Sequence, residues 1–377
     1  MRTAEQVGEP GYVFVDNVRF WSMLSIVALH CAGGLDVQKQ HALVTKMVLV
    51  TPFKFGTIGF FLISGFLMGN GLRTGQPGRY MNKRLKKIFV PWMRWFALTF
   101  LYMLIMNHVH TDPGFKLDHK ELVELKKLLQ RDMFQTPFWF VPNLLVGMYV
   151  LVMFRKHLDD VRLGAALLAI NLFYVANIYG RWLPSGHQEA VLGFVFYLWL
   201  GGYAAQHYDR LRAWLARVPM TALVTMAVVA AGCAFGESLW MHRLGRAVID
   251  NTLRLSNQVF SVLVVLALVK LKRPVWPRFV DVRRETFGLY LSHAIVLNVM
   301  LRGAQAVFGR APHSWLTTTY VGMAVKWLMV FVLTYGLGIT VARRLAAWSA
   351  TQRIVGLGGR ERVRVERPEE NEVRALA

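Results

Sequence analysis

The sequence predicts an all-α, polytopic integral membrane protein with about ten transmembrane helices and both termini in the cytoplasm. Hydrophobic residues make up 55% of the 377-residue chain and charged residues only 18%, with a mean hydropathy of +0.36. An ordinary soluble protein is less apolar and carries more charge. Apolar runs long enough to cross a bilayer, about 20 residues for roughly 30 Å of hydrocarbon, recur along almost the whole chain.

Charged residues between the apolar runs mark the ends of the expected helices. The second run is the least regular, because Pro52, Lys54 and five glycines between positions 56 and 71 interrupt it. Such a segment predicts an irregular or closely packed helix, the kind that lines a site. The ten expected spans are 12–34, 49–72, 88–108, 138–154, 163–181, 188–206, 218–239, 254–271, 285–303 and 316–341.

The 44 lysines and arginines indicate the topology. They are denser in alternate loops, on the side of the N-terminus, and the positive-inside rule makes that side cytoplasmic. The net charge of +22 is then mainly a topology signal, with attraction to anionic lipid as a second effect. Nucleic-acid binding is not expected, because the basic residues are spread over several juxtamembrane loops.

The domain organisation follows from these breaks. Residues 1–11 form a short cytoplasmic N-terminus, 12–342 the transmembrane domain, and 343–377 a flexible, charged cytoplasmic tail. The first span is expected to be retained, because no small residues mark a cleavage site near Cys31. Cys31 and Cys233 are expected to be packing residues, and no metal site is expected. Residues 116–132 have helical apolar spacing and predict an amphipathic helix on the outer surface.

The first span carries two ionisable residues. Arg19 and His30 are eleven residues apart, which at 100° per residue is three turns plus about 20°, so they share one helix face about 16 Å apart. Intramembrane ionisable groups are costly and by default mark a functional site. The alternative is that Arg19 extends to the membrane interface while His30 is a hydrogen-bonded packing residue.

The ninth span places Tyr290 and His293 one turn apart, at a depth compatible with His30. His293 is either a site residue or a histidine that hydrogen-bonds a neighbouring helix. Ser64, beside Gly65, is more simply a packing serine. Asn143 after Pro142 and Glu237 at the end of the seventh span are further polar candidates without an assignable partner.

Five segments in order along the chain resemble the membrane-embedded acyltransferase family 3. They are "VRFWSMLSIVALH", "GFFLISGFLM", "NKRLKKIFVPW", "FWFVPNLLVGMYVL" and "FGLYLSHAIVL". The resemblance covers about residues 13–342. It implies an enzyme of cell-envelope and secreted glycans, and of some antibiotics, that takes acyl groups from a cytoplasmic acyl-CoA. It also implies residence in the inner membrane of a bacterium.

The resemblance assigns roles to particular residues. The family's basic residue followed ten residues later by His matches Arg19 and His30, and its pair of arginines three apart looks like Arg84 and Lys87. The lysine departs from the family pattern and weakens a bidentate phosphate contact there. In a helix, Lys87 and Arg94 lie two turns apart on nearly one face, with Pro91 between them as a kink. These cations would hold the phosphates of acyl-CoA, although lysines and arginines here could also serve topology alone.

We therefore expect His30 to deprotonate an acceptor hydroxyl while Arg19 and the third-span cations hold the donor, all in one buried cavity. Acetyl is the expected group; succinyl, longer acyl groups and an acyl-histidine intermediate stay open. The expected partners are an envelope or secreted glycan acceptor and membrane lipids, with a homo-oligomer or polysaccharide-assembly partners left open. Two other classes remain: an exporter of glycan or lipid intermediates, and a scaffold without chemistry.

Overall fold

The structure, a computed structural model, describes most of the chain. The described residues are 12–34, 40–69, 71, 76–108, 119–134, 136–186, 188–246, 249–308, 315–348 and 351–356. These residues form helices joined by turns and contain no β-strand, which confirms the all-α prediction. The charged segment 357–377 and residues 1–11 lie outside the described part.

Each expected span overlaps a helix or a run of consecutive helices. In chain order these are α1 (Val13–Cys31), α2 with α3 (Gln40–Val50 and Phe55–Gly69), α4 with α5 (Pro77–Arg84 and Val90–His108), α7 (Phe140–Met153), α8 (Val161–Gly180), α9 (Val195–Gln206), α11 (Met220–Arg243), α12 (Leu255–Lys270), α13 (Val282–Phe308) and α15 (Tyr320–Ala347). The remaining α-helices in the described residues are α6 (His119–Phe134), α10 (Tyr208–Arg217) and the four-residue α14 (Trp315–Thr318).

Several of these helices are long and apolar enough to cross a bilayer. By length and composition, 5 helices in the described residues qualify, or up to 6 if a bent pair counts as one span. The pair is Leu122–Phe134 with Pro137–Met153, which meet at 68°. The chain is therefore a multi-pass membrane protein; the count of ten and the cytoplasmic termini stay predictions. The qualifying helices are Ala42–Gly69, Pro77–Met106, Val161–Gly180, Met220–Arg243 and Tyr320–Ala347.

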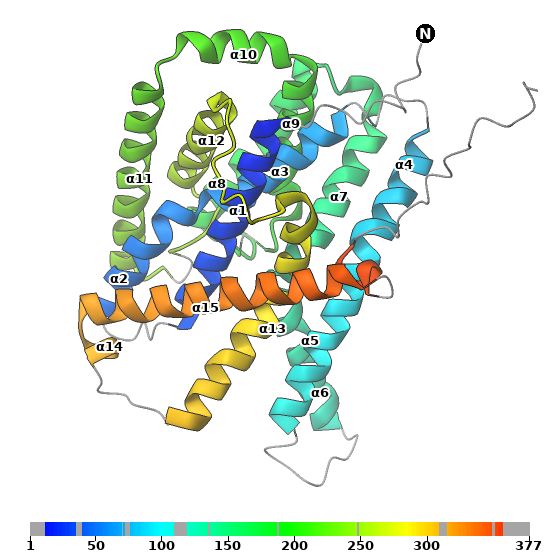
Figure 1. Cartoon of the computed structure of the whole chain (residues 1–377). Helices are drawn as coiled ribbons and strands as arrows, with labels where there is room; N and C mark the ends of the chain where they lie inside the picture. The colour runs from blue at the N-terminus through cyan, green and yellow to red at the C-terminus, as the bar shows by residue number, and fades with distance from the viewer. Residues whose placement is uncertain are drawn as a thin grey trace, which may run out of the picture.

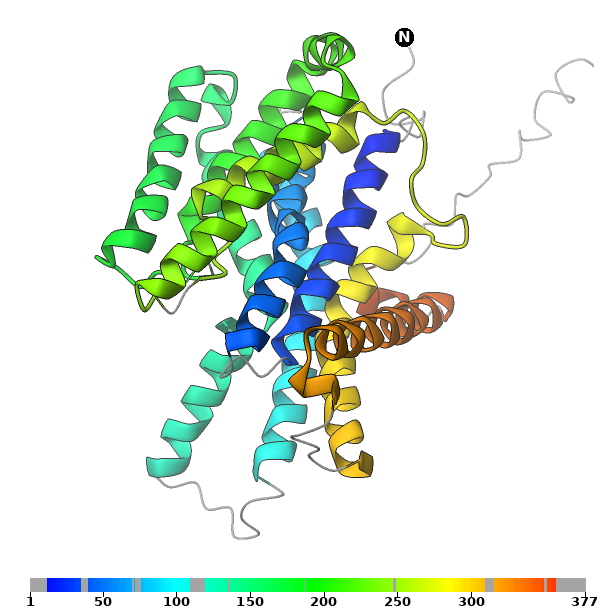
Figure 2. The ribbon, with the colours of Figure 1, turned by 90° about the vertical axis from the view of Figure 1, so that its left-hand side faces the viewer.

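Helix α1 runs through the middle of the bundle, with α3, α12, α13 and α15 packed around it (Figures 1 and 2). Its buried residues are spread around the helix instead of forming one stripe. A helix buried on all sides by its neighbours is a core helix. This central position places both Arg19 and His30 against other helices.

The second span is irregular and closely packed, as its composition predicted. The short helix η2 (Thr51–Phe53) separates α2 from α3. Helices α3 and α9 make the most extensive helix–helix contact, because small residues let the two backbones approach. A Cβ atom added to Gly65 would lie 2.0 Å from the carbonyl oxygen of Leu198, so only glycine fits there.

The third span is helical but contains a wider turn. Between α4 and α5, residues Leu85–Phe89 form a π-helix, in which the Val90 N–H bonds to the carbonyl of Leu85. Pro91, which has no N–H to donate, follows this turn. The π turn changes the angular spacing of side chains on either side of it.

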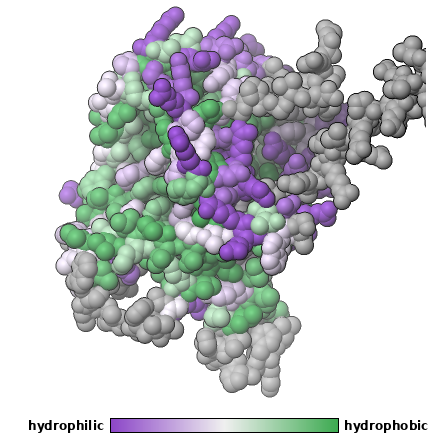
Figure 3. Space-filling model, in the orientation of Figure 1, coloured by the Kyte–Doolittle hydropathy of each residue, from purple (hydrophilic) through white to green (hydrophobic). Residues whose placement is uncertain are grey.

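Opposite ends of the molecule are formed by different elements. In Figure 1, α10 and the start of α1 lie at the top, whereas α6 and the last turns of α13 lie at the bottom. Hydrophilic side chains gather over the upper and right-hand part of that face, and apolar side chains cover much of the left and lower part (Figure 3). Helix α6 contacts α5 but diverges from it at the bottom of Figure 2, and most of its described side chains are exposed.

The start of the predicted flexible tail is packed. Helix α15 continues to Ala347, and η7 (Gln352–Val355) folds back onto α5 and α13. Val355 is only 1% exposed, and the indole of Trp95 donates a hydrogen bond to the carbonyl of Ile354 (3.1 Å). The described residues of this segment therefore contact the bundle, and the domain boundary at 343 stays a prediction. Cys31 is buried, as expected, whereas Cys233 is exposed on α11.

Candidate functional site

Two cavities follow one another along α1. The first, the arginine cavity, has a volume of about 240 Å³ and the second, the histidine cavity, about 340 Å³. Phe140 and Tyr290 line both, so they form a common wall. The polar residues lining the arginine cavity are Arg19, Ser64, Tyr80, Arg84, Arg283, Thr286 and Tyr290. Those lining the histidine cavity are His30, Lys46, Lys54, Thr57, Thr136, Gln188, Asp250, Thr252 and Tyr290.

Asp16 holds two of the arginines of the first cavity. Its carboxylate accepts a hydrogen bond from Nη1 of Arg19 (2.8 Å) and another from Nε of Arg283 (2.9 Å). Asp16 itself is buried and the Arg283 side chain is 58% exposed, so the contact ties α1 to the start of α13 at the edge of the cavity. One carboxylate shared by two guanidinium groups leaves an excess of positive charge facing the cavity.

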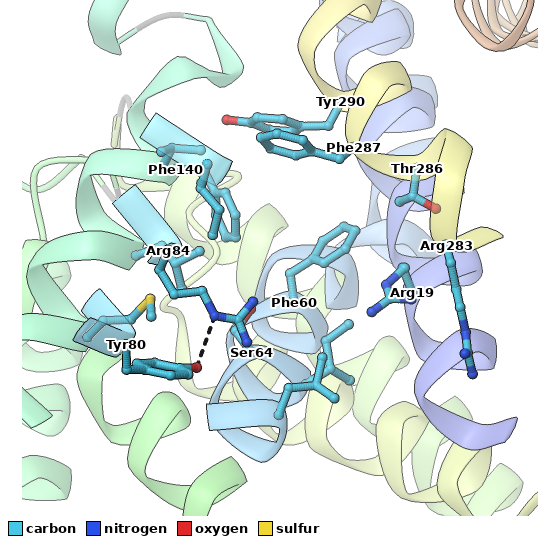
Figure 4. A pocket seen from close by; sticks show the side chains of 16 residues that line it. Arg19, Phe60, Ser64, Tyr80, Arg84, Phe140, Arg283, Thr286, Phe287 and Tyr290 are labelled. Carbon is cyan, nitrogen blue, oxygen red and sulfur yellow. Dashed lines mark hydrogen bonds between the residues drawn. The ribbon is translucent and has the colours of Figure 1, made fainter. Parts of the chain in front are cut away.

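The third arginine comes from the end of α4. Nε of Arg84 donates to the hydroxyl of Tyr80 (3.0 Å), and the guanidinium carbon lies 5.2 Å from the Tyr80 ring centroid. In Figure 4 the Arg84 and Arg19 guanidinium groups point into the cavity from opposite sides. Three such groups around a narrow, otherwise largely apolar space are suited to bind phosphates.

The wall between the cavities is aromatic. The Tyr290 hydroxyl donates to the carbonyl of Pro137 (2.6 Å), and the rings of Phe140 and Tyr290 meet nearly edge-on with centroids 5.8 Å apart. The stacked rings of Tyr290 and Phe287 are seen at the far end of the arginine cavity in Figure 4. Arg19 and His30 thus line two adjoining cavities with these rings between them, and their joining into a single cavity stays a prediction.

His30 lines the histidine cavity with one ring nitrogen already engaged. Its Nδ1 lies 2.8 Å from the carbonyl oxygen of Ile26. A carbonyl can only accept, so Nδ1 carries the hydrogen, and the neutral ring keeps its lone pair on Nε2. The sequence prediction that His30 sits in a cavity is met, and its tautomer suits proton abstraction.

His293 lies beside His30, as the matching depths predicted, but it lines neither cavity. The two ring centroids are 5.2 Å apart, and His293 is fully buried. Its Nδ1 donates to the carbonyls of Tyr290 (2.7 Å) and Leu289 (3.2 Å). Its Nε2 is buried and has no hydrogen-bond partner among the described residues. His293 is thus placed to set the position of the His30 ring.

Lys87 and Arg94 do not join Arg84 at the cavity. Both side chains are exposed, and neither lines a cavity. The sequence argument assumed straight α-helical spacing, and the π-helical turn at Leu85–Phe89 changes it. The second and third guanidinium groups come from α1 and α13 instead.

The other candidate residues have separate roles. Ser64 lines the arginine cavity, whereas Asn143 donates to the carbonyl of Gln188 (3.1 Å) and orients a loop. Glu237 lines neither cavity and accepts hydrogen bonds from Tyr179 and Ser256. Asn143 and Glu237 are therefore structural. Among the described residues, no cluster of three His, Cys, Asp or Glu side chains could hold a metal ion.

Sequence reasoning missed Arg283 and Lys54 as site residues. Arg283 counted only as a topology signal, and Lys54 only as an interruption of an apolar run. A usable signal was present for Lys54, because a lysine between two apolar helices of one span is costly to bury. For Arg283 the signal is structural, since its partner Asp16 lies 267 positions away in the chain.

Comparison with known proteins decides the family. The model of the acyltransferase domain of family 3 matches residues 12–343. The chain belongs to acyltransferase family 3. No curated protein and no solved structure matches it. The protein is therefore a membrane acyltransferase, and an exporter or scaffold role is not favoured.

Proposed function

We propose that this acyltransferase moves an acyl group, with acetyl expected, from a cytoplasmic acyl-CoA to a hydroxyl of a cell-envelope or secreted glycan. The setting is the inner membrane of a bacterium. The arrangement of α1 carries the proposal. One helix face presents Arg19 to a phosphate-binding cavity and His30 to a second, more polar cavity, with Phe140 and Tyr290 between.

The arginine cavity is suited to the donor. Arg19, Arg84 and Arg283 would bind the phosphates of the nucleotide end, and the largely apolar remainder would accept the pantetheine arm. The arm would carry the thioester about 16 Å along α1, the rise from Arg19 to His30. Passage needs the Tyr290 or Phe140 ring to turn aside.

His30 is suited to the chemistry. Its Nε2 takes the proton of the acceptor hydroxyl as the oxygen attacks the thioester carbonyl. The new C–O bond forms, and the tetrahedral intermediate expels the CoA thiolate with cleavage of the C–S bond. The imidazolium then returns its proton to the thiolate, so His30 is regenerated. Ordering of the ring through the Ile26 carbonyl supports this role.

The test is transfer by the purified protein. The protein in lipid nanodiscs is incubated with [¹⁴C]acetyl-CoA and envelope glycans, and label in glycan and free CoA thiol are both measured. Equal molar release of CoA and labelling of glycan is expected. Absence of both with every acceptor would contradict the proposal. Label trapped on His30 without acceptor would establish the acyl-histidine route instead of direct transfer.

A further inference from the structure

The histidine cavity contains a cation that the transfer step does not use. Lys54 lies between η2 and α3, in the same lining as His30. Its side chain is only 6% exposed. Burying an ammonium group in a membrane protein is costly unless another group compensates its charge.

The protein supplies only part of this compensation. The Lys54 ammonium donates a hydrogen bond to the backbone carbonyl of Asp250, not to its carboxylate. The Asp250 carboxylate lies instead 3.8 Å from Nζ of Lys46. Among the described residues, no carboxylate pairs with Lys54 within 4.0 Å. Because a lysine has three N–H donors, Lys54 keeps donors for a ligand.

The charges of the lining do not balance. Lys46 and Lys54 contribute two positive charges, Asp250 contributes one negative charge, and His30 as a base is neutral. The cavity therefore has an excess of one positive charge. In surroundings of low dielectric, an anion brought by a ligand would be bound strongly there.

The lysine is held in place by a buried polar network behind it. The Asp250 loop is fixed by Asn251, which donates to the carbonyl of Ser185 (2.6 Å). Arg254, 1% exposed, donates to the carbonyls of Ala234 (3.0 Å) and Asn251 (3.4 Å), and lies 3.9 Å from the Glu237 carboxylate. Lys54 is thus part of a rigid site and not a mobile surface lysine.

We infer that the histidine cavity selects acceptor sugars that carry an anionic group, a carboxylate or a phosphate, and that Lys54 binds it. This inference rests on the proposed function. Binding the anion at Lys54 fixes the sugar at a second point, so a neighbouring hydroxyl is directed at Nε2 of His30. The cavity volume of about 340 Å³ is within the range of small-ligand sites.

The test compares matched acceptors with the intact protein in nanodiscs. The first pair is a uronic-acid oligosaccharide and its methyl ester, which have the same hydroxyls but differ in charge. The second pair is a phosphorylated oligosaccharide and its dephosphorylated form. Wild-type protein is expected to prefer the anionic member of at least one pair by about 10- to 100-fold in kcat/KM, as for a hydrogen bond between charged groups. The pair that shows the preference identifies the anion.

Variants assign the preference to one residue. Lys54→Met removes the charge at similar length, and its ratio of anionic to neutral acceptor is expected to fall to about one, while Lys54→Arg keeps a preference. Lys126→Met, at an exposed position of α6, is the control and should retain the wild-type ratio.

Three outcomes would overturn the inference. They are equal rates for both members of each pair in wild type, an unchanged ratio in Lys54→Met, and an equal loss for both members, which would make Lys54 only a support for the Asp250 loop. The comparison in wild-type protein does not depend on whether the variant folds. Transfer to neutral and anionic acceptors alike refutes this inference alone, whereas transfer to none refutes the proposed function.

Discussion

The imidazole rings of His30 and His293 lie with centroids 5.2 Å apart, and each is fixed through Nδ1 to a backbone carbonyl of its own helix. The two fixed rings therefore differ in accessibility. His30 lines a cavity, while His293 lines neither cavity and its Nε2 is buried. In the proposed mechanism His30 is therefore the base, and we expect His293 to be a positioning residue.

Replacing His30 tests its proposed role as the base. His30→Ala and His30→Gln are expected to lower kcat by about 10²- to 10⁴-fold, the usual contribution of general-base catalysis, without loss of acyl-CoA binding. The measurement is transfer of labelled acetyl together with binding of a non-hydrolysable acyl-CoA analogue. His157→Ala, at an exposed position, is the control and should behave as wild type. Near-normal turnover in His30→Ala would contradict the proposal that His30 is the base.

Replacing His293 disturbs the base without removing it. His293→Phe keeps an aromatic ring but loses the Nδ1 hydrogen bonds, so the His30 ring loses part of its support. A misplacement of about 1 Å can cost up to about 100-fold in rate, and we expect a loss in kcat of about 10-fold. The KM for acyl-CoA should not change. A change in that KM with unchanged kcat would show that His293 acts on the donor site instead.

Arg283 is expected to bind the donor, although the sequence pattern points to Arg94. Arg283→Gln should raise the KM for acyl-CoA by about 10- to 100-fold, the worth of a hydrogen bond to a charged group. Arg94→Gln is the matched control, because that side chain is exposed and lines neither cavity. Steady-state kinetics with varied acyl-CoA make the comparison. A larger rise in KM for Arg94→Gln than for Arg283→Gln would place the phosphate site at α5 instead.

Tyr290 separates the two cavities, and two substitutions test this wall. Tyr290→Phe removes one of two hydrogen bonds to the Pro137 carbonyl, which still accepts from the Phe140 N–H, at a cost of about 0.5–1.5 kcal/mol, visible as a lower melting temperature. Tyr290→Ala should also open the wall, so acyl-CoA is hydrolysed without an acceptor. Free thiol release in the absence of glycan measures this leak. If Tyr290→Ala releases no more free thiol without glycan than wild type does, the ring does not block the passage between the cavities.

Gly65 sets the contact between α3 and α9. Gly65→Ala places a methyl group 2.0 Å from the Leu198 carbonyl oxygen, and such overpacking costs about 1–3 kcal/mol or more. In Gly232→Ala, the control on α11, the added Cβ meets nothing within 4 Å, so this helix should be unchanged or stabilised by about 0.5–1 kcal/mol. Thermal unfolding in detergent distinguishes the two. Equal melting temperatures would contradict the close packing.

Features that depend on local pattern were predictable from the sequence. The apolar runs predicted the helices, and the eleven-residue spacing predicted that Arg19 and His30 share a face of α1. Helix geometry alone fixes the relative direction of these two side chains, so no knowledge of distant contacts was needed.

Features that depend on distant contacts were not predictable. The wall of Tyr290 relies on Pro137, 153 positions away. The π-helical turn at Leu85–Phe89 moved Lys87 and Arg94 away from Arg84, although simple periodicity grouped them. Arg283 is held by Asp16 and Lys54 by the carbonyl of Asp250. These partners are far away in the chain, so no local pattern predicts the contacts.

The aromatic wall of Phe140 and Tyr290 has a consequence for the cell as well as for the enzyme. A continuous water-filled channel beside charged arginines and lysines would let ions and protons run down their gradients. Among the described residues, the rings of Phe140 and Tyr290 lie between the two cavities, and they would interrupt such a channel. In the proposed reaction, the acyl group would then pass between the cavities while the ion gradients across the bilayer are preserved.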